Sequence, residues 1–538
     1  MNKTSPASAY RTPVLLLAIL LLALLLRLNG LGWGIPNGIH PEYSYHPDEI
    51  YFLSWAKLLH QDTIIPKHFQ YGGTFYYSTL QFNNWFGALL TEKFGGQELV
   101  NVFLVGRTLG IAYALLTISL VYATGRLLYS RAAGLVAALV LAVLPAHVFC
   151  ARIIRPDELF ALEYAVHLYI LARLLKKQGT TSANLLIGGV LLGVTVATRF
   201  PAGVLFLGYA TVLFLVLGEE FPGDRAKASK AAIFCLLVLI GTSCLGYLGA
   251  SPHTFFHFPD FLAGMRGQWQ YQSGVFLDAV GRGPNWYQYG GRILIEALGL
   301  PFYGLTLAAV AFAIWQRRAT DILFLSVLLP YFILLATTSW VVTRYTLPLL
   351  PVIALLVAGM LRDLVERKHN LKVLAVGAVV VATLWSVTLD LAFSKTLRGP
   401  DPRDSAALWL AKTAKPGAMI GIFMCYSGDL FTNPPQPRWQ QWVYFHLNQD
   451  GIAQFLSYPF DYIVVNEGIL ADTKRLGTRF PSLLPYNQLY QWSKSSPGYS
   501  LVKTFSTSVS IAGLDLGDNF TSHDSMLARP TILVYQRN

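Results

Sequence analysis

Long apolar runs separated by short polar stretches occupy the first three quarters of the chain. Each run is long enough to cross the roughly 30 Å hydrocarbon layer of a membrane, and together they predict eleven membrane helices. The runs lie near residues 12–28, 102–125, 133–150, 158–175, 183–200, 202–218, 231–250, 292–315, 321–340, 344–362 and 371–393. At Phe200–Pro201 the pattern predicts either a tight turn or a kinked, re-entrant segment. The pattern indicates an all-α polytopic membrane bundle.

Basic residues gather in alternate connections between these runs. The clusters are Arg173, Lys176 and Lys177; Arg225, Lys227 and Lys230; Arg317 and Arg318; and Arg362, Arg367, Lys368 and Lys372. Cytoplasmic loops are enriched in lysine and arginine, so the N-terminus is predicted inside and the C-terminal part outside. We expect a multi-pass protein of the plasma (inner) membrane whose loops 29–101 and 251–291 face outward.

After residue 393 the pattern becomes that of a mixed domain. A helix is predicted at Asp404–Lys412, followed by alternating segments that are typical of strands. The predicted strands are Ala418–Phe423, Tyr462–Asn466, Leu501–Phe505 and Thr531–Gln536. The sequence therefore divides into a membrane catalytic domain, residues 1–393, and an extracytoplasmic α/β domain, residues 394–538.

Composition supports the membrane class and limits the function classes. Hydrophobic residues make up 54% of the chain and charged residues 13%, whereas soluble domains carry about 25% charged residues. The net charge of +12 sits mostly at the ends of apolar runs, which indicates contact with anionic lipid and no binding of nucleic acid. The four cysteines form neither a disulfide framework nor a zinc-binding pattern.

Two acidic pairs and four arginines are predicted at the outer ends of the helices. The first pair lies in His46-Pro47-Asp48-Glu49, and the second in Arg155-Pro156-Asp157-Glu158. The arginines, which depart from the positive-inside pattern, are Arg152, Arg155, Arg199 and Arg344. Ionisable groups at membrane level are costly and usually functional. Carboxylates and arginines on one face indicate a site that handles a hydroxyl and a phosphate.

Simpler interpretations exist for each group. Either acidic pair could cap a helix, and an external arginine could extend to lipid headgroups. His253 and His257 could bind a metal, although a loop histidine is more often a plain hydrogen-bonding residue. We therefore assign no metal ligand and no cofactor, and a divalent metal remains an alternative.

In their order and spacing, these segments resemble the GT-C superfamily of membrane glycosyltransferases. The resemblance is to the branch of protein O-mannosyltransferases and aminoarabinose transferases, glycosyltransferase family 39. It rests on the following segments: Asp48-Glu49, Phe69–Tyr77, Arg107, Leu144-Pro145, Arg155-Pro156-Asp157, Ala197–Phe200 and Arg344–Pro351. His46–Glu49 is also similar to the mannosyltransferases of glycolipid-anchor and N-glycan assembly, so the subfamily stays open.

The resemblance implies an inverting glycosyltransferase. It would move a mannose- or arabinose-like sugar from a polyprenyl-phosphate carrier to a hydroxyl of a lipid, glycan or protein acceptor on the outer face. One carboxylate then suffices as general base, and cations stabilise the departing phosphate. The predicted catalytic residues are Asp48 as base, with Asp157 and Glu49 orienting the acceptor or a metal. The predicted substrate-binding residues are His46, Arg155, Glu158, Arg199, Arg344 and Tyr345.

Three other functions fit parts of the pattern. A transporter or flippase of lipid-linked glycans is disfavoured because the sequence has no GxxxxGK[ST] loop and no visible inverted repeat. An oligosaccharide polymerase or ligase would use a diphosphate-linked glycan instead. A non-catalytic membrane anchor for the tail is disfavoured by the paired acids.

Overall fold

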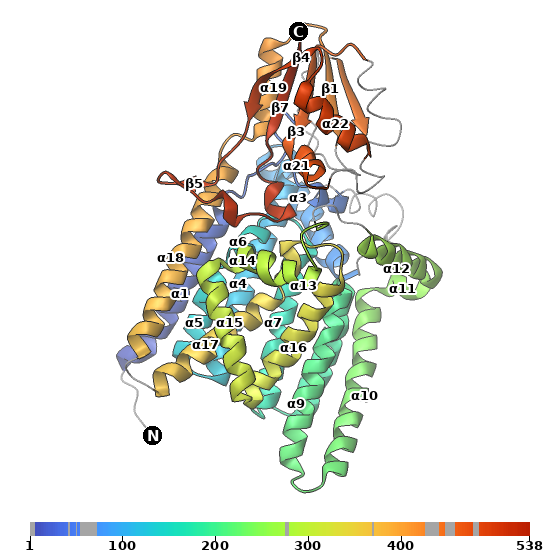
Figure 1. The fold of residues 1–538 in the computed structure, drawn as a ribbon. Helices are drawn as coiled ribbons and strands as arrows, with labels where there is room; N and C mark the ends of the chain where they lie inside the picture. Colours follow the sequence, from blue (N-terminus) through green and yellow to red (C-terminus); the bar gives the residue numbers. More distant parts are fainter. Residues whose placement is uncertain are drawn as a thin grey trace.

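The computed structural model describes residues 6–40, 44–49, 51–53, 73–274, 279–367, 371–424, 441–446, 458–476 and 484–538. Most of these residues form a helical bundle, and a small sheet with its helices lies beyond one end of it (Figure 1). Of the sequence features named above, Phe69–Gly72 and Lys368 lie outside the described residues.

The bundle is built from the helices that the apolar runs predict. Its main helices are α1 (Pro6–Leu28), α4 (Glu98–Leu128), α5 (Arg131–Ala142), α6 (Pro145–Cys150), α7 (Pro156–Leu175), α8 (Thr181–Thr198), α9 (Leu205–Glu220), α10 (Arg225–Ala250), α14 (Leu294–Leu298), α15 (Leu300–Gln316), α16 (Ala319–Thr337), α17 (Leu349–Arg367) and α18 (Leu371–Arg398). Buried apolar side chains of most of these helices form one continuous core.

Six helical stretches among the described residues are long and apolar enough to cross a membrane. They are Glu98–Leu128, Thr181–Thr198, Phe200–Glu220, Arg225–Ala250, Ala319–Thr337 and Leu371–Thr413. Three shorter apolar helices, Thr12–Leu28, Arg131–Ala142 and Leu300–Gln316, lie beside them. The chain is thus a multi-pass membrane protein by composition and helix length, while the count of eleven spans stays a prediction.

Two predicted runs are broken in the structure. The run 133–150 divides into α5 and α6 because Pro145 starts a new helix at its first position, where the missing N–H costs nothing. The run 292–315 divides at Gly299, which ends α14 with φ +74, a backbone conformation that glycine adopts without strain. At Phe200–Pro201 the chain makes the short 3₁₀ turn η2 (Phe200–Val204), which corresponds to the tight-turn alternative.

The C-terminal part contains a five-stranded sheet in the order β2-β1-β3-β7-β4. The strands are β1 (Met419–Met424), β2 (Gln441–His446), β3 (Tyr462–Asn466), β4 (Tyr499–Phe505) and β7 (Ile532–Arg537). β2, β1 and β3 are parallel, and β7 runs antiparallel to both β3 and β4. The four predicted strands and the predicted helix, α19 (Pro402–Thr413), are confirmed; β2 was not predicted.

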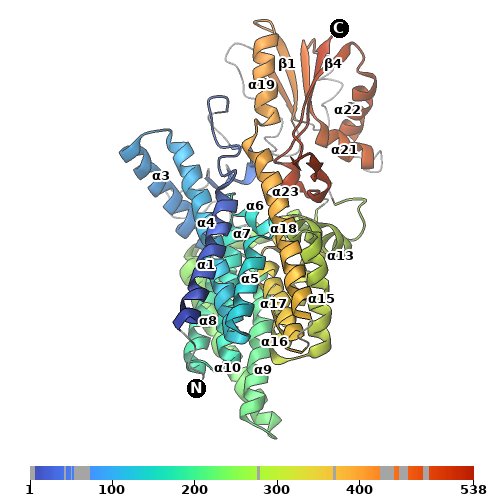
Figure 2. The ribbon, with the colours of Figure 1, turned by 90° about the vertical axis from the view of Figure 1, so that its left-hand side faces the viewer.

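The remaining helices of this part are α21 (Glu467–Leu476) and α22 (Leu484–Ser495). Between β4 and β7 the chain leaves the sheet and contacts the bundle. This excursion holds the hairpin β5 (Ser510–Ile511) and β6 (Leu514–Asp515) and the short helix α23 (His523–Met526). Phe520 stacks on Phe393 of α18 with ring centroids 4.6 Å apart. Figure 2 shows α23 lying between the sheet and the end of the bundle.

Loops at the same end of the bundle complete the layer beneath the sheet. The first loop leads into η1 (Phe75–Leu80) and α3 (Gln81–Phe94). The second contains α11 (Pro252–Phe256), α12 (Phe258–Ser273), α13 (Asn285–Tyr287) and the π-helical segment η3 (Gln288–Ile293). The Tyr45 ring of the first loop lies 3.8 Å from the guanidinium carbon of Arg403 in α19. The bundle end, its loops and the tail therefore meet in one region.

Candidate active site

The two acidic segments predicted from the sequence meet at the start of α7. The first loop turns at Gly34, where φ is +61 and an added Cβ would lie 2.9 Å from the Cβ of Tyr45. The backbone N–H of Tyr45 donates to the carbonyl of Gly34 at 2.9 Å, which places His46–Glu49 over the bundle. Pro156 begins α7 and puts Asp157 in its first turn, where the helix N-terminus favours an anion.

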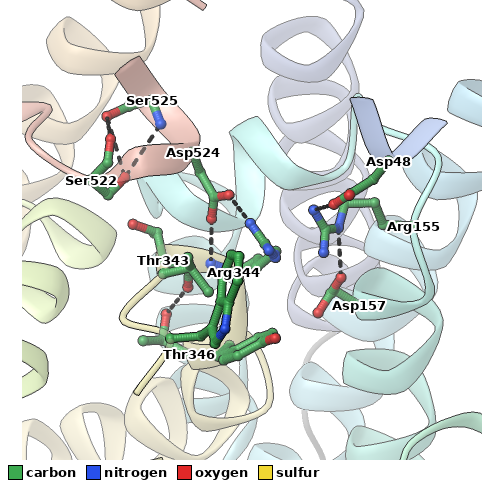
Figure 3. Close-up of polar contacts among 12 residues, drawn as sticks. Asp48, Arg155, Asp157, Thr343, Arg344, Thr346, Ser522, Asp524 and Ser525 are labelled. Atoms are coloured by element: carbon green, nitrogen blue, oxygen red, sulfur yellow. Dashed lines mark hydrogen bonds and ion pairs between the residues drawn. The ribbon is translucent and has the colours of Figure 1, made fainter. Parts of the chain in front are cut away.

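Arg155 joins the two segments into one cluster. Its Nη1 forms an ion pair with Asp48 Oδ2, and its Nε donates to Asp157 Oδ2 at 3.0 Å (Figure 3). Nη2 of Arg199 lies 2.8 Å from the other oxygen of Asp157. The side chains of Arg155 and Asp157 are 4% exposed, whereas that of Asp48 is 34% exposed. Asp48 is thus the carboxylate of this cluster that an incoming hydroxyl can reach.

The electrostatics of the cluster keep Asp48 ionised. Burial favours its neutral form, but the nearby guanidinium groups of Arg155 and Arg344 outweigh burial and lower the pKa of the carboxyl below its ordinary value. His46 is buried, and burial lowers the pKa of its imidazole to about 4, so the ring is neutral at physiological pH. The cluster therefore presents an anionic carboxylate beside cations.

Arg344 and Tyr345 enter the same region from the 3₁₀ turn η4 (Thr343–Thr346). The Tyr345 ring centroid lies 5.4 Å from the guanidinium carbon of Arg344 and 5.2 Å from that of Arg199. Both distances fit cation–π contacts, and Gln272 donates to the Tyr345 hydroxyl at 3.1 Å. Tyr345 thus links the two arginines that were predicted separately.

Glu49, predicted as catalytic, lies in a different environment from Asp48. Its Oε1 accepts from Arg107 Nε at 2.9 Å and from the Ile154 N–H at 3.0 Å. Its Oε2 accepts from Arg107 Nη2 at 2.7 Å and from Ser44 Oγ at 2.6 Å. Each oxygen thus already accepts two hydrogen bonds in a fully buried position. This pattern favours a structural role, in which Glu49 ties the first loop to α4 and to the segment between α6 and α7.

Glu158 and His46 are buried but make few polar contacts. Glu158 Oε2 lies 3.8 Å from His147 Nε2 in α6, so it faces the bundle interior and not Arg155. Neither Glu158 oxygen, and neither His46 ring nitrogen, has a hydrogen-bond partner within the described part of the chain. Arg152, whose Nη2 donates to the Leu26 carbonyl at 2.6 Å and to Ser394 Oγ at 2.9 Å, holds helices together.

Sequence reasoning missed one carboxylate of this region. Asp524 of α23 forms an ion pair with Arg344 Nη1, and its other oxygen accepts from the Arg344 backbone N–H at 3.1 Å. No spacing or motif connects residue 524 with residue 344. An acidic residue opening a short helix in the tail was the only available signal.

The residues considered for a metal lie apart from this cluster. His253 Nδ1 is 3.1 Å from the hydroxyl of Tyr77, which is an ordinary hydrogen bond. In the described ranges, no group of three or more histidine, cysteine, aspartate or glutamate side chains has a metal-binding arrangement.

Known proteins resemble this chain both in sequence and in fold. Residues 82–247 match the family model described as dolichyl-phosphate-mannose-protein mannosyltransferase. The apo structure of the Archaeoglobus fulgidus oligosaccharyltransferase matches with a TM-score of 0.55 and 12% identity, covering 97% of this chain and 78% of that one. No curated protein sequence is significantly similar to this chain.

Two further solved structures align over nearly the whole chain. The archaeal oligosaccharyltransferase AglB from Archaeoglobus fulgidus, in complex with an inhibitory peptide and a dolichol-phosphate, matches with a TM-score of 0.56 and 13% identity. The match again covers 97% of this chain and 78% of that one. ArnT from Cupriavidus metallidurans, bound to undecaprenyl phosphate, matches with a TM-score of 0.49 and 12% identity over 97% of each chain. The oligosaccharyltransferase matches show that the fold extends over both the bundle and the tail.

Proposed function

From the premise that this chain has the fold of the GT-C membrane glycosyltransferases, we propose that it transfers a sugar from a polyprenyl-phosphate carrier to a hydroxyl acceptor. The observation that carries the proposal is the ionised, partly exposed carboxylate of Asp48 beside Arg155 and Arg344. A base for the acceptor and cations for a phosphate lie in one cluster. A neighbour of the same fold was solved with a dolichol-phosphate, which supports a lipid phosphate as donor.

The reaction is a single displacement with inversion. The acceptor oxygen bonds to the anomeric carbon as the bond from that carbon to the phosphate oxygen breaks. The acceptor's proton moves to Asp48, and the polyprenyl phosphate departs as an anion. Because a phosphate monoester is a good leaving group, one carboxylate suffices, in contrast to the carboxylate pair of glycosidases. Arg155, Arg199 and Arg344 stabilise the negative charge on the departing phosphate.

The other predicted residues support this core. Asp157 holds Arg155 and Arg199 through separate oxygens, so it fixes the distance between two phosphate-binding cations. The Tyr345 ring lies against both Arg199 and Arg344, so it fixes the distance between these two cations. The neutral His46 is buried in the first loop two residues before Asp48, where it adds no charge that would compete with the base.

The sugar in this proposal is a mannose- or arabinose-like unit, and the acceptor is a lipid, a glycan or a protein. The reaction needs no cofactor. It takes place at the outer face of the plasma membrane, because the basic loops lie at the opposite end of the bundle from the cluster. The start of α10, the helix whose first turn contains Lys227, lies at that opposite end (Figure 1).

Labelling of introduced cysteines tests this orientation. Cysteines at Asn285 in α13 and Lys494 in α22 should react with a membrane-impermeant maleimide added outside intact cells. A cysteine at Lys227 should react only after the membrane is opened. Labelling of the Lys227 position from outside would place the cluster in the cytoplasm and contradict the proposal.

The donor is tested with the purified full chain in lipid nanodiscs. Transfer of a radiolabelled sugar should require a polyprenyl-phosphate-linked donor, and a nucleotide sugar should give no product without lipid carrier. Transfer from the nucleotide sugar alone would refute the donor assignment. Movement of the lipid-linked sugar between leaflets, without a glycosylated product, would favour the flippase alternative.

A further inference from the structure

A segment of the tail, Thr521–Ser525, is built into the cluster. The backbone N–H groups of Thr521 and Ser522 donate to Glu296 Oε2 at 2.6 and 2.7 Å. The hydroxyl of Ser522 donates to the other oxygen of Glu296, which also accepts from Thr343 Oγ1 at 3.3 Å. Glu296 is 7% exposed. One buried carboxylate of α14 therefore connects the tail to the residue that precedes Arg344.

Asp524, two residues after Ser522, holds Arg344 at two points. One oxygen pairs with the guanidinium Nη1 and the other accepts from the backbone N–H (Figure 3). Burial favours the neutral carboxyl, but Arg344 and Arg155 outweigh burial and lower the pKa of Asp524. Because one carboxylate contacts both the backbone N–H and the guanidinium of Arg344, it fixes the orientation of the Arg344 side chain.

The side-chain contact with Asp524 uses only the Nη1 side of the guanidinium. Arg344 Nε is buried and makes no hydrogen bond to any described residue. Arginine binds phosphate oxygens through pairs of parallel N–H groups, and this geometry requires a fixed orientation of the guanidinium plane. Asp524 takes Nη1, which lies on the opposite side of the guanidinium from Nε. The Nε–H group of Arg344 is therefore a donor on the side away from Asp524 that no described residue satisfies.

We infer that Asp524 is a positioning residue for Arg344, and that the tail segment held by Glu296 completes the donor-phosphate site. The inference rests on the proposed function. It assigns the tail a direct part in the site, because a phosphate-binding group must be held by its neighbours to within a fraction of an ångström to act efficiently.

Binding of undecaprenyl phosphate to the full chain in nanodiscs tests the inference without any turnover. Asp524→Asn keeps the size of the side chain but replaces one oxygen by an amide that cannot accept from arginine. Hydrogen bonds to charged groups contribute enough that binding should weaken by about tenfold or more. Asp518→Asn, which changes the charge at an exposed position of the same excursion, should bind as the wild type does.

The outcomes separate the two levels of the proposal. Binding by the wild type and tenfold weaker binding by D524N support the positioning role. Equal binding by D524N would overturn the positioning role, because the carboxylate would then contribute nothing to the site. Tighter binding would also overturn it, because it would mean that the carboxylate only competes with the phosphate for Arg344. Absence of binding by the wild type would overturn the proposed function together with the inference.

A second, milder variant keeps the inference testable if the D524N protein does not fold. Ser522→Ala removes one hydroxyl bond to Glu296 and the N-cap of α23, and it leaves Asp524 in place. Its undecaprenyl-phosphate binding should weaken in the same direction as D524N, and the KM for the donor should rise more than kcat falls. Unchanged binding by a folded S522A protein would contradict the role of the anchored segment.

Discussion

Replacing Asp48 by asparagine is expected to reduce sugar transfer by about 10² or more while donor binding survives. The amide keeps the size of the side chain and an oxygen for Arg155, but it cannot take the acceptor's proton. Initial rates with a polyprenyl-phosphate sugar, together with undecaprenyl-phosphate binding, separate the two effects. The fall should appear in kcat.

Helix capping makes the opposite prediction for this variant. Asparagine caps a helix nearly as well as aspartate, so a residue that only caps would leave turnover near normal in the asparagine variant. Asp260→Asn provides the matched control, because Asp260 in α12 is 69% exposed and contacts only His257 in the ion pairs described. Near-normal turnover by folded D48N would remove Asp48 from the reaction.

Replacing the adjacent Glu49 by alanine should instead destabilise the folded protein. The change leaves Arg107, a fully buried cation, without its carboxylate and leaves the Ile154 N–H without an acceptor. Breaking a buried ion pair by removing one partner costs about 3–5 kcal/mol. Thermal unfolding in detergent and the yield of monodisperse protein should both fall sharply.

A double variant distinguishes this structural role from a chemical one. Glu49→Met combined with Arg107→Met removes both charges, and it should recover part of the stability lost in E49A, because buried pairs can often be replaced by apolar groups. The recovery should be partial, since Arg107 also donates to the carbonyl of Trp33 at 2.7 Å. A stable but inactive E49A protein would show that Glu49 acts in the chemistry.

The sequence was informative where the relevant groups are close together along the chain. Arg155 and Asp157 stand together at the start of one helix. The prediction that they share a face with the acidic pair Asp48-Glu49 followed from the positions of the charged residues along the chain alone. The same reasoning could not separate Asp48 from Glu49. Their roles differ because Arg107, 58 residues away, pairs with only one of them.

Contacts between segments that lie far apart in the sequence could not be predicted from the sequence. Glu296 was not singled out because a lone acid near the start of an apolar run has many possible partners. Asp524 lies 180 residues from Arg344, and no periodicity predicts which residues of a tail will return to the bundle. The break at Leu144–Pro145 was visible as a motif, but the hydrophobic pattern continued through it and merged α5 with α6.

The position of β7 in the sheet has a consequence for the order in which the protein is made. β7 pairs with both β3 and β4, so the excursion that carries Asp524 is enclosed by strands that close only when β7 is in place. A ribosome synthesises every helix of the bundle before it reaches residue 532. During biogenesis, the membrane part can therefore insert and pack while Arg344 still lacks its carboxylate partner. Completion of the site becomes a late, post-insertion event that depends on the last strand joining the sheet.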